Sequence, residues 1–282
     1  YIDDPESNNV PQYIIPDGDV PYSVTCLIMY SVAATFQTQL SEPNYYYGPW
    51  RDSVEVSLAN HTPSYLQRHP FDDLCPIENG AHCPAGCGPI AMLITIAYRG
   101  APNTIANISA ERELLMDYES DTLNSYPILS AWARELGRLG NATYSANGTS
   151  MTNQKLISTM QSLGYSMCGN DVDVATMVNM LRNDKPVILS GFNFSRRGHC
   201  YVVDAVKLKT RDVYYVVNND EVVRNTTNDI AVLMYLNMGW EEVILPSGTV
   251  DTYNGWYVYP YNFVITSNPV LEYSRRMRMY VY

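Results

Sequence analysis

The sequence predicts an α+β fold with two lobes and a cleft between them. Helical patterns occupy the first part of the chain, and short β-branched and aromatic runs replace them after Pro186. In addition, 46% of the 282 residues are hydrophobic, which is enough to bury a sizeable core. We therefore expect a globular protein with a helical half and a strand-rich half.

The clearest helix begins at Cys87 and ends at Gly100. Pro89 suits a first helical turn, Gly100 suits the position after a last turn, and the residues between them are apolar on nearly every face. Such a helix should be central and buried. Proline and glycine signals predict further helices at 110–118, 127–139, 153–163 and 173–183.

The strands expected after Pro186 are rich in Val, Ile, Leu and Tyr and are separated by polar turns. They cover 187–189, 200–203, 213–217, 232–236 and 256–259. Residues 1–57 are rich in Pro, Tyr, Asp and Asn, and we interpret them as an N-terminal extension. The division predicted is therefore an extension over 1–57 and one two-lobed domain over 58–282.

Charge and composition argue against several classes of function. Lys and Arg total 18 against 29 Asp and Glu, a net charge of −11, so we expect no nucleic-acid partner. No run of about 18 apolar residues occurs, so we expect no membrane-spanning helix. The cysteines and histidines form no paired CxxC or HxxxH spacing, so we expect no metal site.

Cys87 is the candidate nucleophile. It begins the buried helix, where unpaired N–H groups and the helix dipole favour an anion and lower the pKa of a thiol. Gly86 and Gly88 on either side allow a substrate backbone to approach. The alternative is a structural cysteine, bridged to Cys83 or Cys75, and the sequence alone leaves that choice open.

His199 is the candidate general base among the 4 histidines. It begins the strand Cys200–Val203, so its imidazole would project from a rigid element. The other histidines lie in polar, loop-like sequence and fit surface positions better: His61, His69 and His82.

Two further polar residues suit this chemistry. Asn237 ends a predicted strand and could orient the imidazole, with Trp240 shielding that hydrogen bond; a simple strand-end cap is the alternative. Gln67 could donate its amide to an oxyanion, since glutamine stabilises negative charge without titrating. An ordinary loop glutamine is the alternative there.

Four segments between residues 58 and 265 carry these candidates in a fixed order. They are Gln67–Pro76, Cys83–Met92, Lys185–Gly191 with Gly198–Asp204, and Tyr235–Trp240 with Asn254–Tyr257. They resemble the Gln-Gly-x-Pro-Tyr-Asn, Pro-x-Gly-Cys-Val-Ala-Thr-Ala, Gly-His-Ala-Phe-Val-x-Asp-Gly and Asn-Trp-Gly-Trp-Gly motifs of one family. That family is the streptopain family of papain-like cysteine peptidases, which includes the interpain-type enzymes of Bacteroides-like bacteria.

The resemblance implies a papain-like fold, with the Cys on a helical lobe and the His on an antiparallel β lobe. It also implies a secreted or cell-surface bacterial endopeptidase that cuts protein or peptide substrates without a cofactor. Residues 1–57 would then be the remnant of a pro-segment or a spacer, and a pro-segment or inhibitor protein would be a partner. The implied catalytic residues are Cys87, His199, Asn237 and Gln67, and the implied substrate-binding residues are Gly86, Gly198, Met238 and Trp240.

The sequence departs from the family motifs at three places. Met238 replaces the first Trp of the last motif, Glu241 and Glu242 replace a Gly-Gly pair, and Gly88–Pro89 replaces Val-Ala after the nucleophile. Two other functions stay open, the first because of Met238 and the Glu pair, and the second because the same Cys-His dyad also serves acyl transfer on related folds. One is a catalytically silent binding or adhesion protein, and the other is an acyl transferase on the same fold.

Overall fold

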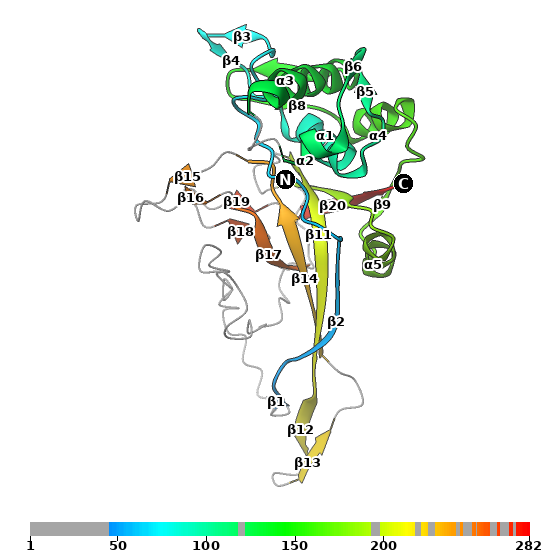
Figure 1. The fold of residues 1–282 in the computed structure, drawn as a ribbon. Helices are drawn as coiled ribbons and strands as arrows, with labels where there is room; N and C mark the ends of the chain where they lie inside the picture. The colour runs from blue at the N-terminus through cyan, green and yellow to red at the C-terminus, as the bar shows by residue number, and fades with distance from the viewer. Residues whose placement is uncertain are drawn as a thin grey trace.

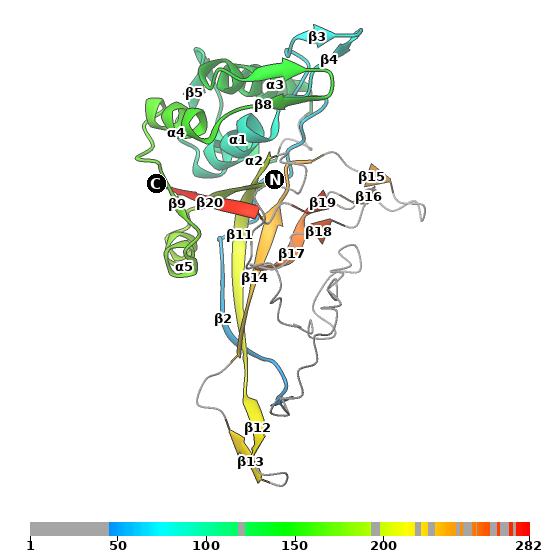
Figure 2. The same cartoon turned by 180° about the vertical axis from the view of Figure 1, so that it is seen from behind.

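A computed structural model gives the fold of the chain. It describes residues 45–117, 122–192, 198–217, 221–224, 229–240, 243–244, 250–251, 253–259, 264–265, 271–272 and 275–282. Helices gather at one end of the molecule and a long antiparallel sheet extends away from them (Figures 1 and 2). The α+β class predicted from the sequence is confirmed. Residues 1–44 of the predicted extension, and Glu241 and Glu242, lie outside the described residues.

The helical lobe is built around one buried helix. Its helices are α1 (Cys87–Arg99), α2 (Arg112–Met116), α3 (Thr122–Leu139) and α4 (Asn153–Ser162). Three short hairpins belong to this lobe: β3 (Ile77–Glu78) with β4 (Ala81–His82) before α1, β5 (Thr104–Ile105) with β6 (Ile108–Ser109) between α1 and α2, and β7 (Thr143–Ser145) with β8 (Gly148–Ser150) between α3 and α4. A fifth helix, α5 (Val174–Arg182), lies beside the sheet (Figure 1).

The predicted helices all occur, with one start corrected. Gly100 ends α1 in the left-handed conformation, with φ 64°, as its sequence position predicted. The helix expected to begin at Pro127 instead begins at Thr122 and contains that proline. The prediction was wrong because Pro127 removes only one backbone hydrogen bond near the helix start. The burial of Leu129 and Trp132 on the next turns outweighs that loss.

The β lobe is one seven-stranded antiparallel sheet. Its path runs β17 (Gly255–Tyr259), β14 (Asp229–Asn237), β11 (Gly198–Arg211), β10 (Val187–Phe192), β20 (Arg275–Val281) and β9 (Cys168–Asp171). Strand β2 (Arg51–Ser57) also pairs with β11. A smaller three-stranded sheet has the order β1 (Tyr45–Tyr47), β12 (Val213–Val217), β13 (Glu221–Arg224). Two-stranded pairs are β15 (Val243–Ile244) with β16 (Val250–Asp251), and β18 (Val264–Ile265) with β19 (Leu271–Glu272).

Strand β11 is the backbone of this sheet. It has 14 residues, of which 202–211 pair with β14 along one edge, while 198–203 pair with β10 and 205–210 with β2 along the other. The register against β14 shifts between Val203 and Ala205, so the bulge falls at Asp204. Residues 45–57, part of the predicted extension, therefore contribute β1 and β2 to sheets of the β lobe.

Helix α1 lies between the two lobes and belongs to both cores. Its Ile90, Met92 and Leu93 join the helical-lobe cluster, which also takes in Ile188 and Val202 of the sheet. Its Tyr98 joins the cluster of the β lobe instead. Each fully buried Ile or Leu of this helix contributes about 2 kcal/mol through burial, so the helix is fixed relative to the sheet. None of the described helices is long and apolar enough to cross a membrane.

Candidate active site

The loop before α1 presents Cys87 in a single backbone conformation. Gly86 has φ 99°, and a Cβ at that position would lie 2.9 Å from Cγ2 of Thr149, so only glycine fits there. The loop is held from two sides. The Ala85 N–H donates to the carbonyl of Gln67 at 2.8 Å, and the Thr149 hydroxyl donates to the carbonyl of Pro84 at 2.6 Å. The Cys87 sulfur is thereby placed at the N-terminus of a buried helix.

The Cys87 thiol contacts two groups on β11. A hydrogen bond from the Cys200 thiol, and then the hydrogen bond and charge of the His199 imidazole, hold the pKa of Cys87 well below its usual range, although burial opposes them. The contact with the Cys87 sulfur and burial raise the pKa of Cys200 well above its usual range. Cys200 is therefore the donor and Cys87 the acceptor in this pair of sulfurs.

Cys75, in the same lobe, shows what burial does without these partners. It is 3% exposed, and burial raises the pKa of its thiol to about 11. Both cysteines are free of disulfides. A thiolate is thus favoured at Cys87 and disfavoured at Cys75.

The ring of His199 is held by a backbone carbonyl. Its Nε2 lies 2.8 Å from the carbonyl oxygen of Met238, and the side chain is buried. A carbonyl oxygen can only accept, so Nε2 carries a proton in both charge states. This leaves Nδ1 to face the Cys87 sulfur and to exchange a proton with it. The arrangement provides what a thiol nucleophile needs from a base.

Two asparagines hold the peptide that carries this carbonyl. The Met238 N–H donates to Oδ1 of Asn254 at 2.8 Å, and the Gly239 N–H donates to Oδ1 of Asn237 at 3.2 Å. The side chain of Met238 itself is fully buried in the core of the β lobe. The acceptor for His199 is therefore fixed on both sides along the chain.

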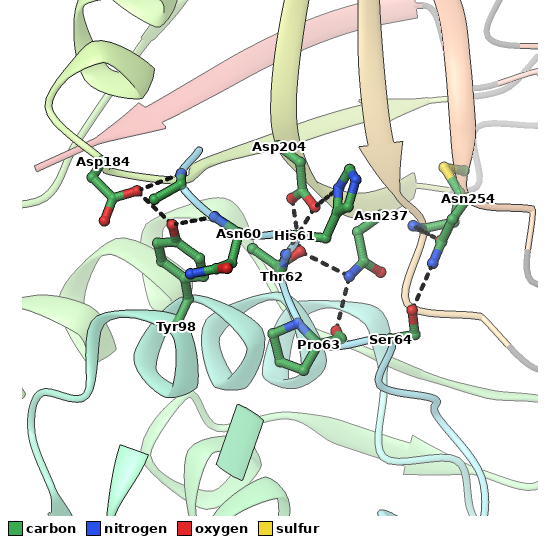
Figure 3. A network of polar contacts seen from close by, with 12 residues as sticks. Asn60, His61, Thr62, Pro63, Ser64, Tyr98, Asp184, Asp204, Asn237 and Asn254 are labelled. Atoms are coloured by element: carbon green, nitrogen blue, oxygen red, sulfur yellow. Dashed lines mark hydrogen bonds and ion pairs between the residues drawn. The ribbon is translucent and has the colours of Figure 1, made fainter. Parts of the chain in front are cut away.

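The same asparagines reach a segment that runs between the lobes (Figure 3). We call residues 59–64 the strap. The Asn237 amide donates to Oγ1 of Thr62 and to the carbonyl of Pro63, both at 2.9 Å, and the Asn254 amide donates to Oγ of Ser64 at 3.2 Å. The strap leads directly to Gln67. One set of hydrogen bonds therefore joins the chain before Gln67 to the turn that holds His199.

Buried Asp204 fixes the strap from the sheet. One carboxylate oxygen accepts from the Thr62 N–H at 2.9 Å and the other from the Thr62 hydroxyl at 2.7 Å. His61 also contacts this carboxylate at 3.4 Å, and the hydrogen bond to Asp204 raises the pKa of His61. Tyr98 and Asp184 bind the strap at its other end through the N–H groups of Asn60 and Ala59 (Figure 3). The bulge in β11 explains how Asp204 reaches the strap from within a strand.

The cysteine and histidine open into one cleft of about 520 Å³. Gln67, Cys87 and His199 lie on it, as do the β8 hairpin and the first residues of α4. Trp240 covers the imidazole, with ring centroids 4.6 Å apart. The Gln67 amide donates to the carbonyl of Gly239 at 3.2 Å, beside the turn that holds His199. The cleft therefore brings a thiol, an imidazole and an amide donor to one space.

Comparison with known proteins points to cysteine peptidases. The model of the Peptidase_C39 like family matches residues 62–240, which is more than half of the chain and includes Gln67, Cys87, His199 and Trp240. The chain belongs to the Peptidase_C39 like family. A search of curated protein sequences finds no significant match.

Solved structures show which fold this family member has. This chain is similar to active wild-type interpain A, a cysteine protease of Prevotella intermedia. The TM-score is 0.55 and the identity 14%, over 82% of this chain and 97% of that one. It is also similar to a prointerpain A fragment from the same organism, with a TM-score of 0.50 and 15% identity, over 80% of this chain and 71% of that one. The fold is papain-like, and the resemblance to papain-like cysteine peptidases read from the motifs is confirmed.

The residues predicted from the sequence take different places in this Peptidase_C39 like protein. Gln67, Cys87, Gly198, His199 and Trp240 line the cleft. Gly86 shapes the loop behind the nucleophile. Asn237 acts on the imidazole only indirectly, because its hydrogen bonds go to Thr62, Pro63 and Gly239. Met238 reaches the site with its carbonyl and buries its side chain. Among the described residues, no three or more His, Cys, Asp or Glu side chains gather in a way that could hold a metal ion.

Three features of the site escaped the sequence reasoning. Cys200 directly follows His199 and stands where the resembled motif has Ala, which was a readable signal for a second thiol. Asn254 belongs to a resembled segment, but nothing in that segment indicates that it binds the Met238 peptide. The β8 hairpin forms one wall of the cleft, and no local pattern in the sequence predicts that residues 148–150 lie beside Cys87.

Proposed function

We propose that this protein is a cysteine endopeptidase, secreted or held at the surface of a bacterial cell, with Cys87 as nucleophile and His199 as general base. The observation that carries the proposal is the contact between the Cys87 sulfur and an imidazole whose other nitrogen is fixed by the Met238 carbonyl. This is the arrangement that activates a thiol in covalent catalysis. The family assignment supports the same reaction class.

Acylation begins with the proton on Nδ1 of His199 and the negative charge on Cys87. The thiolate attacks the scissile carbonyl, and the oxygen becomes an oxyanion. In this mechanism the Cys87 N–H and the Gln67 amide donate to that oxyanion, and the position of Gln67 on the same cleft supports its role. His199 then gives its proton to the leaving amine, and the amine departs with the C-terminal part of the substrate.

Deacylation uses the same groups in reverse. A water molecule enters, His199 removes its proton, and the hydroxide attacks the thioester carbonyl. Collapse of the second oxyanion releases the carboxylic acid product, which loses its proton to water, and restores the ion pair of Cys87 and His199. No metal or organic cofactor takes part in these steps.

The substitution Cys87→Ala tests the proposal, with Cys168→Ala as the matched control. Cys168 is an exposed thiol on β9, so its removal leaves the cleft unchanged. Hydrolysis of a set of internally quenched peptides should disappear in Cys87→Ala and persist in Cys168→Ala. Internal cleavage, read by mass spectrometry, would support an endopeptidase over an exopeptidase.

Two results would contradict the proposal. The first is a wild-type protein that cleaves no peptide and whose Cys87 reacts with iodoacetamide no faster than Cys168 at mildly acidic pH, which would indicate a silent binding protein. The second is transfer of the acyl group to an added amine at the expense of hydrolysis, which would indicate an acyl transferase.

Interaction of residues 1–57 with the cleft, as a pro-segment, is a separate expectation. Limited proteolysis that removes these residues without changing activity or thermal stability would contradict it.

A further inference from the structure

The cleft contains a second thiol that the proposed reaction does not need. Cys200 follows His199 on β11, and both Cys200 and Cys87 line the cleft and are half-buried. Their side chains are hydrogen-bonded to each other. The two sulfurs are therefore neighbours in a space that is open to small solutes.

Rigid elements hold this pair in place. Cys87 begins α1, which is buried over most of its length, and Cys200 lies within the paired part of β11, opposite Ser190 of β10. Cys200 also packs against the cluster of the helical lobe that contains Ile90 and Ala91 of α1. Because neither sulfur can move far away, oxidation of one occurs within reach of the other.

We propose that Cys87 and Cys200 form a reversible disulfide that switches the peptidase off when a hydroperoxide enters the cleft. The inference rests on the proposed function, because a disulfide at Cys87 inactivates the protein only if Cys87 is the nucleophile. The other described cysteines are placed differently: Cys75 and Cys83 are buried in the helical lobe, and Cys168 is exposed on β9.

The chemistry has two steps. The Cys87 thiolate attacks the terminal oxygen of the hydroperoxide, the O–O bond breaks, and an alcohol or water leaves after taking up a proton; Cys87 is then a sulfenic acid. The Cys200 sulfur attacks the Cys87 sulfur, the S–O bond breaks, and the Cys200 proton leaves with the hydroxide as water. Two electrons pass from the two thiols to the peroxide, and the S–S bond closes to about 2 Å.

The disulfide also protects the nucleophile. A sulfenic acid without a neighbouring thiol is oxidised further to sulfinic acid, which thiols do not reduce. With Cys200 beside it, the sulfenic acid is converted to a bond that thiols do reduce. We therefore expect reversible inactivation in the wild type and irreversible inactivation where Cys200 is replaced.

The experiment treats the purified full chain with hydrogen peroxide and measures intact mass, non-reducing peptide maps and recovery after dithiothreitol. The variant Cys200→Ala places the residue of the resembled motif at this position, Cys200→Ser keeps a hydroxyl of similar size, and Cys168→Ala is the control. Wild type and Cys168→Ala should lose two hydrogens in mass, yield a Cys87–Cys200 linked peptide and regain iodoacetamide labelling of Cys87 after reduction. Both Cys200 variants should gain oxygen and fail to regain labelling.

The mass measurements need no peptidase activity, so the two proposals fail separately. A linked Cys87–Cys200 peptide in a protein that cleaves nothing would overturn the function and leave the thiol pair standing. The opposite outcome is a wild type that hydrolyses peptides but, after peroxide, gains oxygen at Cys87 or links Cys87 to a different cysteine. It would overturn the disulfide and leave the function standing. Equal recovery of wild type and Cys200→Ala after reduction would also overturn it.

Discussion

Cys87 and His199 reach the same cleft by different structural means. Cys87 depends on the hydrophobic burial of α1, in which Ile90, Met92 and Leu93 are fully buried. His199 depends on polar contacts that start from the Met238 carbonyl. Asn237 and Asn254 hold the backbone around Met238 and are themselves hydrogen-bonded to the strap, as Figure 3 shows for the two asparagines and the strap. Apolar packing fixes one partner of the pair, and a hydrogen-bond network fixes the other.

The two means have different consequences for mutation. Burial is distributed over many side chains, so a single change along α1 alters stability before it alters the position of the sulfur. The network around His199 is small, and each of its members contacts the next, so the loss of one hydrogen bond moves the imidazole directly. We therefore expect activity to be more sensitive than stability to changes on the His199 side.

The largest effect should come from the imidazole itself. In His199→Ala the Cys87 thiol loses its base, so kcat/KM should fall by about four orders of magnitude. The pKa of Cys87 should rise, because one of the contacts that hold it down is gone. Peptide hydrolysis and the pH dependence of iodoacetamide labelling measure the two effects.

The control for this variant is His69→Ala. His69 is an exposed side chain whose Nδ1 lies 2.9 Å from Asp73, and it lies outside the cleft lining. It should leave both measurements unchanged. Retention of fast labelling at mildly acidic pH in His199→Ala would show that the imidazole does not stabilise the thiolate.

The second-largest loss of activity should come from replacing Gln67, which follows the strap along the chain. Gln67→Ala removes one oxyanion donor and leaves the Cys87 N–H, so kcat should fall by about a hundredfold while KM changes little. Gln154→Ala, at an exposed position on α4, is the matched control. A rise in KM at constant kcat would instead place Gln67 in substrate binding and remove it from the oxyanion site.

The same contrast explains what could be read from the sequence. Helix α1 was predictable because Pro89, the apolar run and Gly100 act locally, and Cys87 came with it. Strands β9 and β20 were missed because Cys168–Asp171 has little β propensity and Arg275–Val281 is largely charged in its first half. They become strands through their neighbours in the sheet, which local patterns do not record.

The residues of the site divide in the same way, into those that a local motif reveals and those that it does not. His199 and Gln67 could be proposed from the sequence because side chains of these types suit the chemistry and lie in recognisable motifs, and both line the cleft. The acceptor for His199 could not be found in this way, because it is a backbone carbonyl and every residue has one. Asn237 was assigned to the imidazole from its place in the motif, whereas its hydrogen bonds in the structure reach the strap and Gly239.

A smaller effect should come from Asn254, as a positioning residue. Asn254→Ala leaves the Met238 N–H without its acceptor, so the peptide that orients His199 loosens and kcat should fall about tenfold. Asn254→Asp keeps the acceptor oxygen and loses only the donor to Ser64, so it should recover most of the activity. Steady-state kinetics of both variants, with thermal unfolding alongside, measure this. Equal losses in both would show that the contact with Ser64, and not the Met238 peptide, is what matters.

The smallest effect should be a shift in pH dependence when Cys200 is replaced. The Cys200 thiol donates to the Cys87 sulfur and is the largest cause of the low pKa of Cys87. Removing the donor in Cys200→Ala raises that pKa, so a smaller fraction of Cys87 is thiolate at any pH below it. The acidic limb of the labelling profile should therefore move to higher pH, while labelling well above the pKa stays as in the wild type, because His199 remains in place. If the acidic limb of Cys200→Ala stayed where it is in the wild type, His199 alone would stabilise the Cys87 thiolate. The reactivity of Cys87 would then depend entirely on the hydrogen bonds that hold His199.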